Sequence, residues 1–269
     1  MEMTESQHFI NDLYVAADAT FAPAVYPIYG FVEGADPVVI GTCFAIEYRG
    51  RKFLVSAAHV IDDHRKATLA LAPVRGGEPI TVEGQFYIVN PGDKLREDDP
   101  FDFAWHELTT EEALKIDCIP ERNLEDDRTS GGGTCLYIAM GFPASKNKKI
   151  SPANRAKRLL VPNRARYMNV ETDATEYFEF REMSSETHIA IERENRSHSL
   201  DGVEENTIGH KGLSGGPLIN TGARLNPASL GRPKVSGILI ENDEKRKIIV
   251  ALRLSVVLRH IDSVVDAGS

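Results

Sequence analysis

The sequence predicts an all-β protein built from two lobes of antiparallel strands. Short runs rich in β-branched and aromatic residues, separated by Gly, Asp or Arg-Gly, follow one another along most of the 269 residues. They do not alternate with long helical patterns, so a parallel βαβ sheet is not expected, and many short strands are typical of a sandwich or a barrel. A polar stretch at 120–133 with three consecutive glycines predicts a linker between the lobes.

The first lobe is predicted to span residues 22–120. Residues 1–21 before it are polar with a few apolar positions, which indicates an N-terminal arm or a short helix. A capping pattern at 110–115 predicts a brief helical turn near the end of the lobe. The strands expected in this lobe are at 24–32, 37–48, 52–58, 68–71, 80–89 and 103–108.

The second lobe is predicted to span residues 134–253, followed by a C-terminal helix and tail at 254–269. Apolar residues recur at helical spacing from Val256 to Val264, which predicts one amphipathic helix over 255–264. The strands expected in this lobe are at 134–140, 177–183, 187–192, 217–220, 235–240 and 247–252.

One segment, 141–170, carries eight basic residues and no acidic one. Two interpretations are open: a docking surface for an acidic partner, or a solvated loop or hairpin balanced by the acidic stretch after Glu171. The second is favoured, because charge runs usually form solvated faces. The basic residues are Lys146, Lys148, Lys149, Arg155, Lys157, Arg158, Arg164 and Arg166.

The composition is that of an ordinary globular protein, 42% hydrophobic and 26% charged. A net charge of −9 disfavours nucleic acid and anionic membranes as partners. No apolar segment approaches 18 residues and the N-terminus has no basic leader, so we expect a cytoplasmic protein without a membrane anchor. The three cysteines, Cys43, Cys118 and Cys135, are widely spaced and are expected to be reduced thiols. No HExxH motif or Cys/His cluster predicts a metal, and no cofactor is expected.

Ser214 is the first candidate catalytic residue, because it lies among four glycines in the stretch 209–219. Glycines permit positive φ and let a substrate approach main-chain N–H groups closely. Such a turn suits a nucleophile whose oxyanion is held by backbone donors. A tight hairpin without chemistry is the alternative, so partners elsewhere in the chain must decide.

Two upstream residues have the character of such partners. His59 follows a strongly apolar run in Ser-Ala-Ala-His, and Asp102 opens Asp-Phe-Ala-Trp directly before another apolar strand. A partly buried carboxylate beside an imidazole orients the ring and stabilises the imidazolium. Asp98 and Asp99, in the preceding loop, are the competing acids.

The motifs Ser-Ala-Ala-His, Asp-Phe-Ala and Gly-Leu-Ser-Gly-Gly-Pro, in this order, resemble the three signatures of trypsin/chymotrypsin-like serine peptidases. The resemblance spans roughly 22–265, with its strong signal in these three motifs. It implies two antiparallel six-stranded barrels and an endopeptidase acting on a protein or peptide substrate. Ser214 would be the nucleophile, His59 the base and then the acid, and Asp102 the orienting group, with the N–H groups of Gly212 and Ser214 as the oxyanion hole.

The resemblance also has departures, which are closer in character to intracellular bacterial members than to secreted ones. Leu213 stands where secreted relatives carry an acid that pairs with a newly released N-terminus. Val60 stands where they carry a half-cystine, opposite Cys43. Leu213 motivates the hypothesis that the enzyme is latent until a partner protein orders the 209–214 loop.

The same resemblance implies positions for substrate-binding residues. Ile208 would lie at the floor of the primary specificity pocket, so a preference for Lys or Arg is not expected. The pocket is then either apolar or, through Lys211 near its rim, suited to an acidic side chain. Ile240, Glu241 and Asn242 would form the strand that pairs with an extended substrate.

Two other function classes fit part of the sequence, an esterase and a non-catalytic binding module. Gly212 to Gly216 also matches the GxSxG motif of α/β-hydrolase esterases, but that fold requires the acid and the histidine after the serine, and a helix that Gly-Gly-Pro would spoil. The second class is a non-catalytic binding module on the same fold, in which the groove or the basic segment holds a partner and the triad is misaligned. Three matching motifs favour the enzyme.

Overall fold

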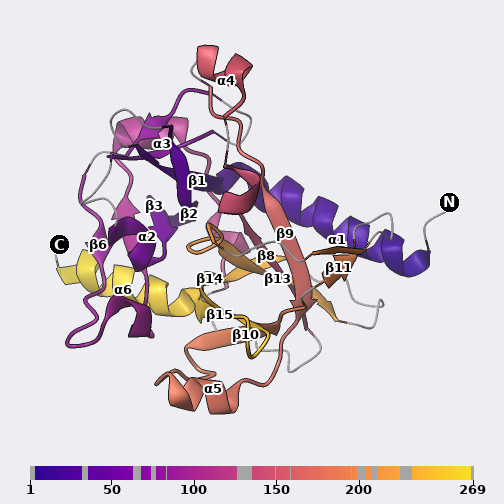
Figure 1. Cartoon of the computed structure of the whole chain (residues 1–269). Coiled ribbons are helices and arrows are strands. Elements are labelled where there is room, and N and C mark those ends of the chain that lie inside the picture. The colour runs from indigo at the N-terminus through magenta and orange to yellow at the C-terminus, as the bar shows by residue number, and fades with distance from the viewer. Residues whose placement is uncertain are drawn as a thin grey trace.

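The chain folds into two curled antiparallel sheets followed by a C-terminal helix (Figure 1). The mainly β architecture predicted from the strand pattern is therefore confirmed. The computed structural model of the chain describes residues 4–31, 36–62, 68–73, 77–82, 84–125, 135–148, 150–157, 159–194, 196–198, 204–206, 211–224 and 232–267.

The first sheet has seven strands, and its centre is the hairpin that leads to His59. Two residues, Arg49 and Gly50, connect the long strands, and both have positive φ, 48° and 72°. That geometry matches the right-handed twist of an antiparallel pair. In sheet order the strands are β5 (Ile80–Thr81), β4 (Thr68–Leu71), β1 (Val25–Phe31), β2 (Val38–Tyr48), β3 (Arg51–Ser56), β7 (Ala104–Glu107) and β6 (Tyr87–Ile88).

The second sheet has six strands and carries the serine-containing turn at one end of β13. Among its strands, β9 lies in the basic segment and was not expected from the sequence. In sheet order they are β10 (His188–Glu192), β15 (Ile248–Arg253), β14 (Lys234–Asp243), β13 (Pro217–Arg224), β8 (Cys135–Gly141) and β9 (Ala165–Val170). A separate two-stranded ribbon pairs β11 (Arg196–His198) with β12 (Glu204–Asn206).

The prediction of a strand at 177–183 was wrong, because helix α5 (Thr175–Phe180) covers the first part of this segment. Asp173 accepts hydrogen bonds from the N–H and the hydroxyl of Thr175, which turns the chain into the helix. The adjacent residues Tyr177 and Phe178 are both buried, as a helix allows and a one-sided strand does not. The strand expected at 80–89 is likewise two short strands, β5 and β6, separated by Gly84 with a φ of 118°.

The N-terminal segment is a longer helix than expected, α1 (Glu5–Phe21), which begins with a capping box between Thr4 and Gln7. Asp18 near its end binds Arg166 (2.5 Å) and Arg164 (3.3 Å) on and beside β9. Two residues of the basic segment are therefore balanced by α1, which corrects the expectation that acids after Glu171 would do so. Lys149 and Arg158 lie outside the described residues.

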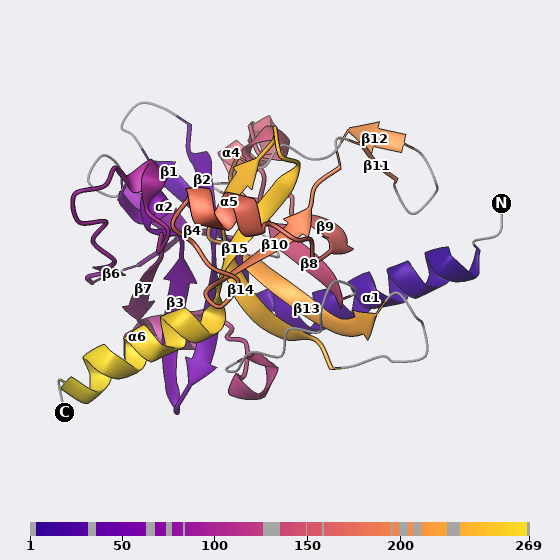
Figure 2. The same ribbon diagram turned by 90° about the horizontal axis from the view of Figure 1, so that it is seen from below.

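The C-terminal helix predicted over 255–264 is confirmed as α6 (Leu254–Ala267). It leaves the second sheet and packs against the first, as Figure 2 shows. Nε1 of Trp105 on β7 donates to Nδ1 of His260 (3.0 Å), and the Tyr48 hydroxyl donates to Asp262 (3.0 Å). None of the helices in the described ranges is long and apolar enough to cross a bilayer.

One buried apolar cluster runs through both sheets and under α6. It includes Phe44 and Trp105 of the first sheet, Ile138 and Val250 of the second, and Leu258 of the helix. Because a close-packed apolar interior resists rearrangement, the two sheets hold residues at their junction in fixed relative positions. The linker predicted at 120–133 begins with a 3-10 turn at Glu121–Asn123, and its remainder from 126 lies outside the described residues.

Candidate active site

His59 lies in a short helix that directly follows a buried strand. Strand β3 ends at Ser56, whose hydroxyl donates to the carbonyl of Thr42 on β2 (2.8 Å). The next residues, Ala57 and Ala58, are fully buried, so the packing there admits only small side chains. Helix α2 (Ala58–Asp62) then presents the side chain of His59, which is 39% exposed. The imidazole therefore stands on well-fixed backbone with one side open to solvent.

Asp102 engages His59 with both carboxylate oxygens. Oδ1 accepts from the backbone N–H of His59 (2.8 Å), and Oδ2 forms a short hydrogen bond with Nδ1 of the ring. Asp102 is only 5% exposed, so water competes little for this contact. Because Nδ1 faces the carboxylate, Nε2 is the ring nitrogen left for proton transfer.

The surroundings of His59 raise the pKa of its imidazole above the usual value. Burial opposes the charged form, but the hydrogen bond to Asp102 and the charge of that carboxylate together outweigh burial. Two further charges, Arg96 and Asp62, act in opposite directions. A stabilised imidazolium is what a group needs if it accepts a proton during a reaction.

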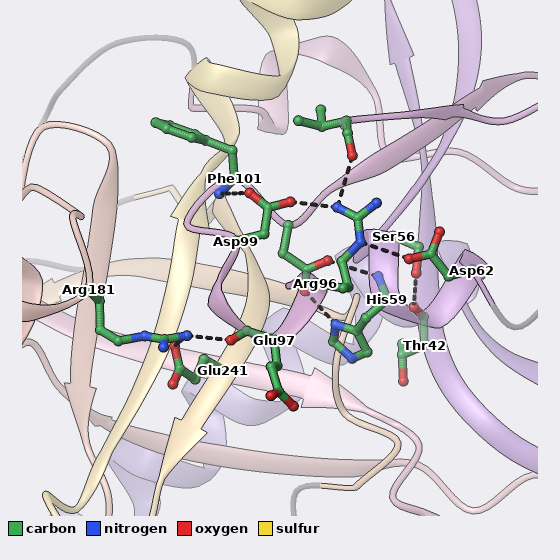
Figure 3. Close-up of polar contacts among 12 residues, drawn as sticks. Thr42, Ser56, His59, Asp62, Arg96, Glu97, Asp99, Phe101, Arg181 and Glu241 are labelled. Atoms are coloured by element: carbon green, nitrogen blue, oxygen red, sulfur yellow. Dashed lines mark hydrogen bonds and ion pairs between the residues drawn. The ribbon is translucent and has the colours of Figure 1, made fainter. Parts of the chain in front are cut away.

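Arg96 links the two segments that carry His59 and Asp102. Its Nε donates to Asp62 at the end of α2 (2.7 Å), and its Nη1 donates to Asp99 (2.5 Å), as the close-up shows (Figure 3). One guanidinium thus joins the helix of His59 to the loop that precedes Asp102. The planar, multiply donating side chain of arginine suits such bridging.

The two competing acids have other partners. Asp99 accepts from the backbone N–H of Phe101 (2.9 Å) and from Arg96, and it is buried. Asp98 accepts from Nη1 of Arg181 (2.7 Å). Of Asp98, Asp99 and Asp102, Asp102 is the one in contact with the imidazole.

The backbone of Ser214 lies directly against the residues that precede His59. Its carbonyl accepts from the N–H of Thr42 on β2 (2.9 Å). The next residue, Gly215, has a φ of 83°, and a Cβ there would collide with the Thr42 carbonyl oxygen, the Ser56 hydroxyl and the Ala57 nitrogen. The turn of the second sheet therefore requires glycine in order to pack on the first.

The peptide before Gly212 is held in one orientation. The carbonyl of Lys211 accepts from the N–H of Ala144 (2.7 Å), and the carbonyl of Gly212 accepts from the Thr42 hydroxyl (2.6 Å). The N–H and C=O of a trans peptide point in opposite directions, so the Gly212 N–H points away from Ala144. Gly212 has a φ of 97°, which a residue with a side chain rarely adopts.

Within the described residues, three hydrogen bonds are absent at this turn: one from the Gly212 N–H to a carbonyl, one from the Ser214 N–H to a carbonyl, and one between the Ser214 hydroxyl and His59. N–H groups without an acceptor are suited to an anionic oxygen. Leu213 between them is 5% exposed and belongs to the apolar cluster of the second sheet.

The residues expected to bind substrate are only partly brought to this site. Lys211 is exposed at the turn, and Ile208 lies outside the described residues. Ile240, Glu241 and Asn242 are consecutive on β14, whose residue Leu239 accepts from the N–H that follows Ser214 (2.7 Å). Ile240 is 6% exposed, so its main chain rather than its side chain could meet a ligand.

Sequence reasoning missed Thr42, Arg96 and Arg181. Arg96 carried a weak signal, because it stands beside three acids shortly before Asp102. Thr42 and Arg181 carried none, because their contacts join segments far apart in the chain. In the part of the chain that the structure describes, no group of three His, Cys, Asp or Glu side chains could hold a metal ion, and none of the three cysteines is in a disulfide.

Comparisons with known proteins add no family to this geometry. No protein-family model matches the chain, and no curated protein matches it significantly.

Proposed function

We propose that this chain is a serine endopeptidase of the trypsin/chymotrypsin type, with two lobes that correspond to its two β-barrels. The observation that carries the proposal is the buried carboxylate of Asp102, which holds both the backbone and the ring of His59 beside the Ser214 turn. A structural histidine does not need its ring fixed through Nδ1 with Nε2 left for proton transfer. A general base does.

In the proposed reaction, the Ser214 hydroxyl attacks the carbonyl carbon of a peptide bond, and Nε2 of His59 accepts the hydroxyl proton. The resulting oxyanion is bound by the N–H groups of Gly212 and Ser214, which have no protein acceptor in the described residues. The C–N bond then breaks as His59 returns the proton to the leaving amine, which leaves an acyl-enzyme. Water, deprotonated by His59, attacks the ester, and His59 returns this proton to the Ser214 oxygen as the ester C–O bond breaks and the carboxylic acid product leaves.

Asp102 contributes by keeping the proton of His59 on Nδ1 and by stabilising the imidazolium. Gly215 contributes by allowing the serine turn to pack against Thr42 and Ala57, in the segment that leads to His59. We propose a protein or peptide as the substrate. Its side-chain preference is tested with a peptide library, and strong cleavage after Lys or Arg would refute the placement of Ile208 at the floor of the pocket.

A fluorophosphonate probe tests the chemistry directly, because it forms a covalent bond only with an activated serine. We expect the wild type to be labelled and Ser214→Ala to remain unlabelled. Ser56→Ala is the matched control, since it removes another buried hydroxyl near the site and should leave labelling intact if the protein folds. Labelling of Ser214→Ala to the wild-type extent would assign the reaction to another residue.

A second candidate function is a latent or non-catalytic binding module on the same fold. The observation that favours it is that, among the described residues, no hydrogen bond joins the Ser214 hydroxyl to His59. In apo enzymes such bonds are often long and tighten only with substrate, so this observation alone does not exclude catalysis. Failure of the wild type to react with the probe, alone and with candidate activating proteins, would favour the binding module.

A further inference from the structure

The loop that leads to Asp102 is held mainly by polar contacts. It runs from residue 94 to residue 101, between β6 and β7. Two of its apolar side chains point to solvent: Leu95 is 66% exposed and Phe101 is 36% exposed. Of its apolar residues only Pro100 is buried, so hydrogen bonds and ion pairs contribute much of what holds the loop in place.

Arg181 of the second lobe makes two of these polar contacts and a third contact with β14. Its Nη1 donates to the carboxylate of Asp98 (2.7 Å), and its Nη2 donates to the carbonyl of Glu97 (2.5 Å), as Figure 3 shows for the second. The same Nη2 lies 3.5 Å from the carboxylate of Glu241 on β14. The Arg181 side chain is only 15% exposed. One guanidinium therefore connects the loop before Asp102 to strand β14.

A second contact from the same lobe supports the end of the loop. Nε2 of His188 on β10 donates to the carbonyl of Pro100 (2.7 Å), two residues before Asp102. A carbonyl only accepts, so this nitrogen must carry the proton. Burial lowers the pKa of His188 to about 4, so the ring is neutral at pH 7 with its proton on Nε2.

We propose that Arg181 is a positioning residue for the His59–Asp102 pair, because it ties the Asp102 loop to the second lobe. This inference rests on the proposed function in one respect, because it is that function which makes the His59–Asp102 pair catalytic. Within the first lobe, Arg96 joins the same loop to α2, the helix that carries His59. Without Arg181, the Glu97 carbonyl and the Asp98 carboxylate lose this partner and the loop can shift, carrying Asp102 away from the imidazole.

The pKa of His59 reports this positioning without requiring hydrolysis. The charged groups that act on its ring are Asp102, Arg96 and Asp62. Removing a cation from the neighbourhood would by itself raise the pKa of the imidazole, whereas loosening Asp102 would lower it. The direction of the shift therefore separates loss of positioning from loss of charge.

The experiment compares the wild type with Arg181→Ala, Arg181→Lys and Lys94→Ala by NMR titration of His59. For Arg181→Ala we expect the pKa of His59 to fall by about half a unit or more, with loss of the low-field Nδ1–H resonance. Probe labelling should slow roughly tenfold or more, since misplacing a catalytic group by about 1 Å is costly. Arg181→Lys keeps the charge but not the fork of donors, so an intermediate effect is expected.

Lys94→Ala is the matched control, because it removes an ion pair with Glu182 at the same inter-lobe boundary (2.6 Å). That pair is exposed, so we expect labelling to change by less than about twofold. A folded Arg181→Ala protein whose His59 pKa is unchanged or raised would overturn the proposal. If that variant does not fold, Arg181→Lys decides, because it keeps the charge: the pKa of His59 should still fall, and an unchanged or raised value would again overturn the proposal.

The two proposals fail in different ways. If the wild type never reacts with the probe, the peptidase function fails, while the NMR titration still decides whether Arg181 positions the pair. If the probe labels the wild type and Arg181→Ala equally and the pKa of His59 does not fall, the positioning role fails and the peptidase function stands.

Discussion

Gly215→Ala tests the packing that brings the serine turn to the histidine. Gly215 has a φ of 83°, which costs a residue with a Cβ about 1 kcal/mol or somewhat more. The added methyl would also collide with the Thr42 carbonyl, the Ser56 hydroxyl and the Ala57 nitrogen. These three atoms belong to β2 and to the segment before α2, which are themselves hydrogen bonded and buried, so they can yield little.

Overpacking of this kind typically costs about 1–3 kcal/mol. Together with the backbone conformation, Gly215→Ala should lower the free energy of unfolding by about 2–5 kcal/mol. The matched control is Gly50→Ala, because Gly50 has a similar φ of 72° but nothing within 4 Å of an added Cβ. Only the backbone cost, about 1 kcal/mol, applies there.

Urea unfolding of the two variants and the wild type measures both terms. Gly215→Ala should lose more free energy of unfolding than Gly50→Ala, and the difference is the cost of separating the serine turn from the first sheet. Probe labelling of Ser214 should fall in Gly215→Ala and stay unchanged in Gly50→Ala. Equal destabilisation by the two substitutions would refute the close inter-sheet contact on which the site geometry depends.

The remaining predictions concern charge. Asp102→Asn should fold normally and slow probe labelling by about 10⁴-fold, because the wrong tautomer of His59 is then favoured; a near-normal rate would place the acid elsewhere. Since the pKa of His59 is raised above 6.5, the labelling rate should rise with pH to a plateau reached only above that value, and a midpoint below 6.5 would contradict the contact with Asp102. The pKa of His188 is lowered from 6.5 to about 4, so the unfolded chain binds the extra proton between these values and stability should fall as the pH drops through that window. In His188→Gln the loss of stability between pH 7 and pH 5 should be smaller, as urea midpoints would show, whereas an identical loss would assign it to other groups. Asp18→Asn should lower the free energy of unfolding by about 1 kcal/mol and speed proteolytic release of α1, because its ion pairs are partly exposed; unchanged stability and release would mean that apolar contacts alone hold the helix.

Much of the fold was predictable, because its signals are local. The two-residue connection at Arg49 and Gly50, the capping box of α3 (Thr110–Lys115) and the apolar face of α6 each depend on residues a few positions apart. Such patterns act through backbone conformation and side-chain direction, which neighbours in the chain decide. The approach of Asp102 to His59 was also predictable, since each stands at the end of an apolar strand.

Other features depended on contacts that no local pattern carries. The segment at 177–183 alternates like a strand, yet Asp173 turns it into α5, and Tyr177 and Phe178 are both buried there. Strand β9 was missed because its basic residues looked like a solvated face, while Asp18 of α1 supplies their counter-charge. Asp173 is a local signal, but the contact of Phe178 with His188 and the counter-charge of β9 come from other segments.

The sequence by itself determined the β class, the order of His59, Asp102 and Ser214, and the glycines that let the serine turn pack closely. Only the tertiary structure decided what holds Asp102 at the imidazole and what occupies the competing acids, since Asp98 and Asp99 are bound by Arg181 and Arg96 respectively. The physical reason is that strand and turn signals arise between near neighbours, whereas an ion pair forms wherever folding brings opposite charges together. Arg181 and Asp98 are 83 residues apart, and nothing in either stretch alone specifies the other.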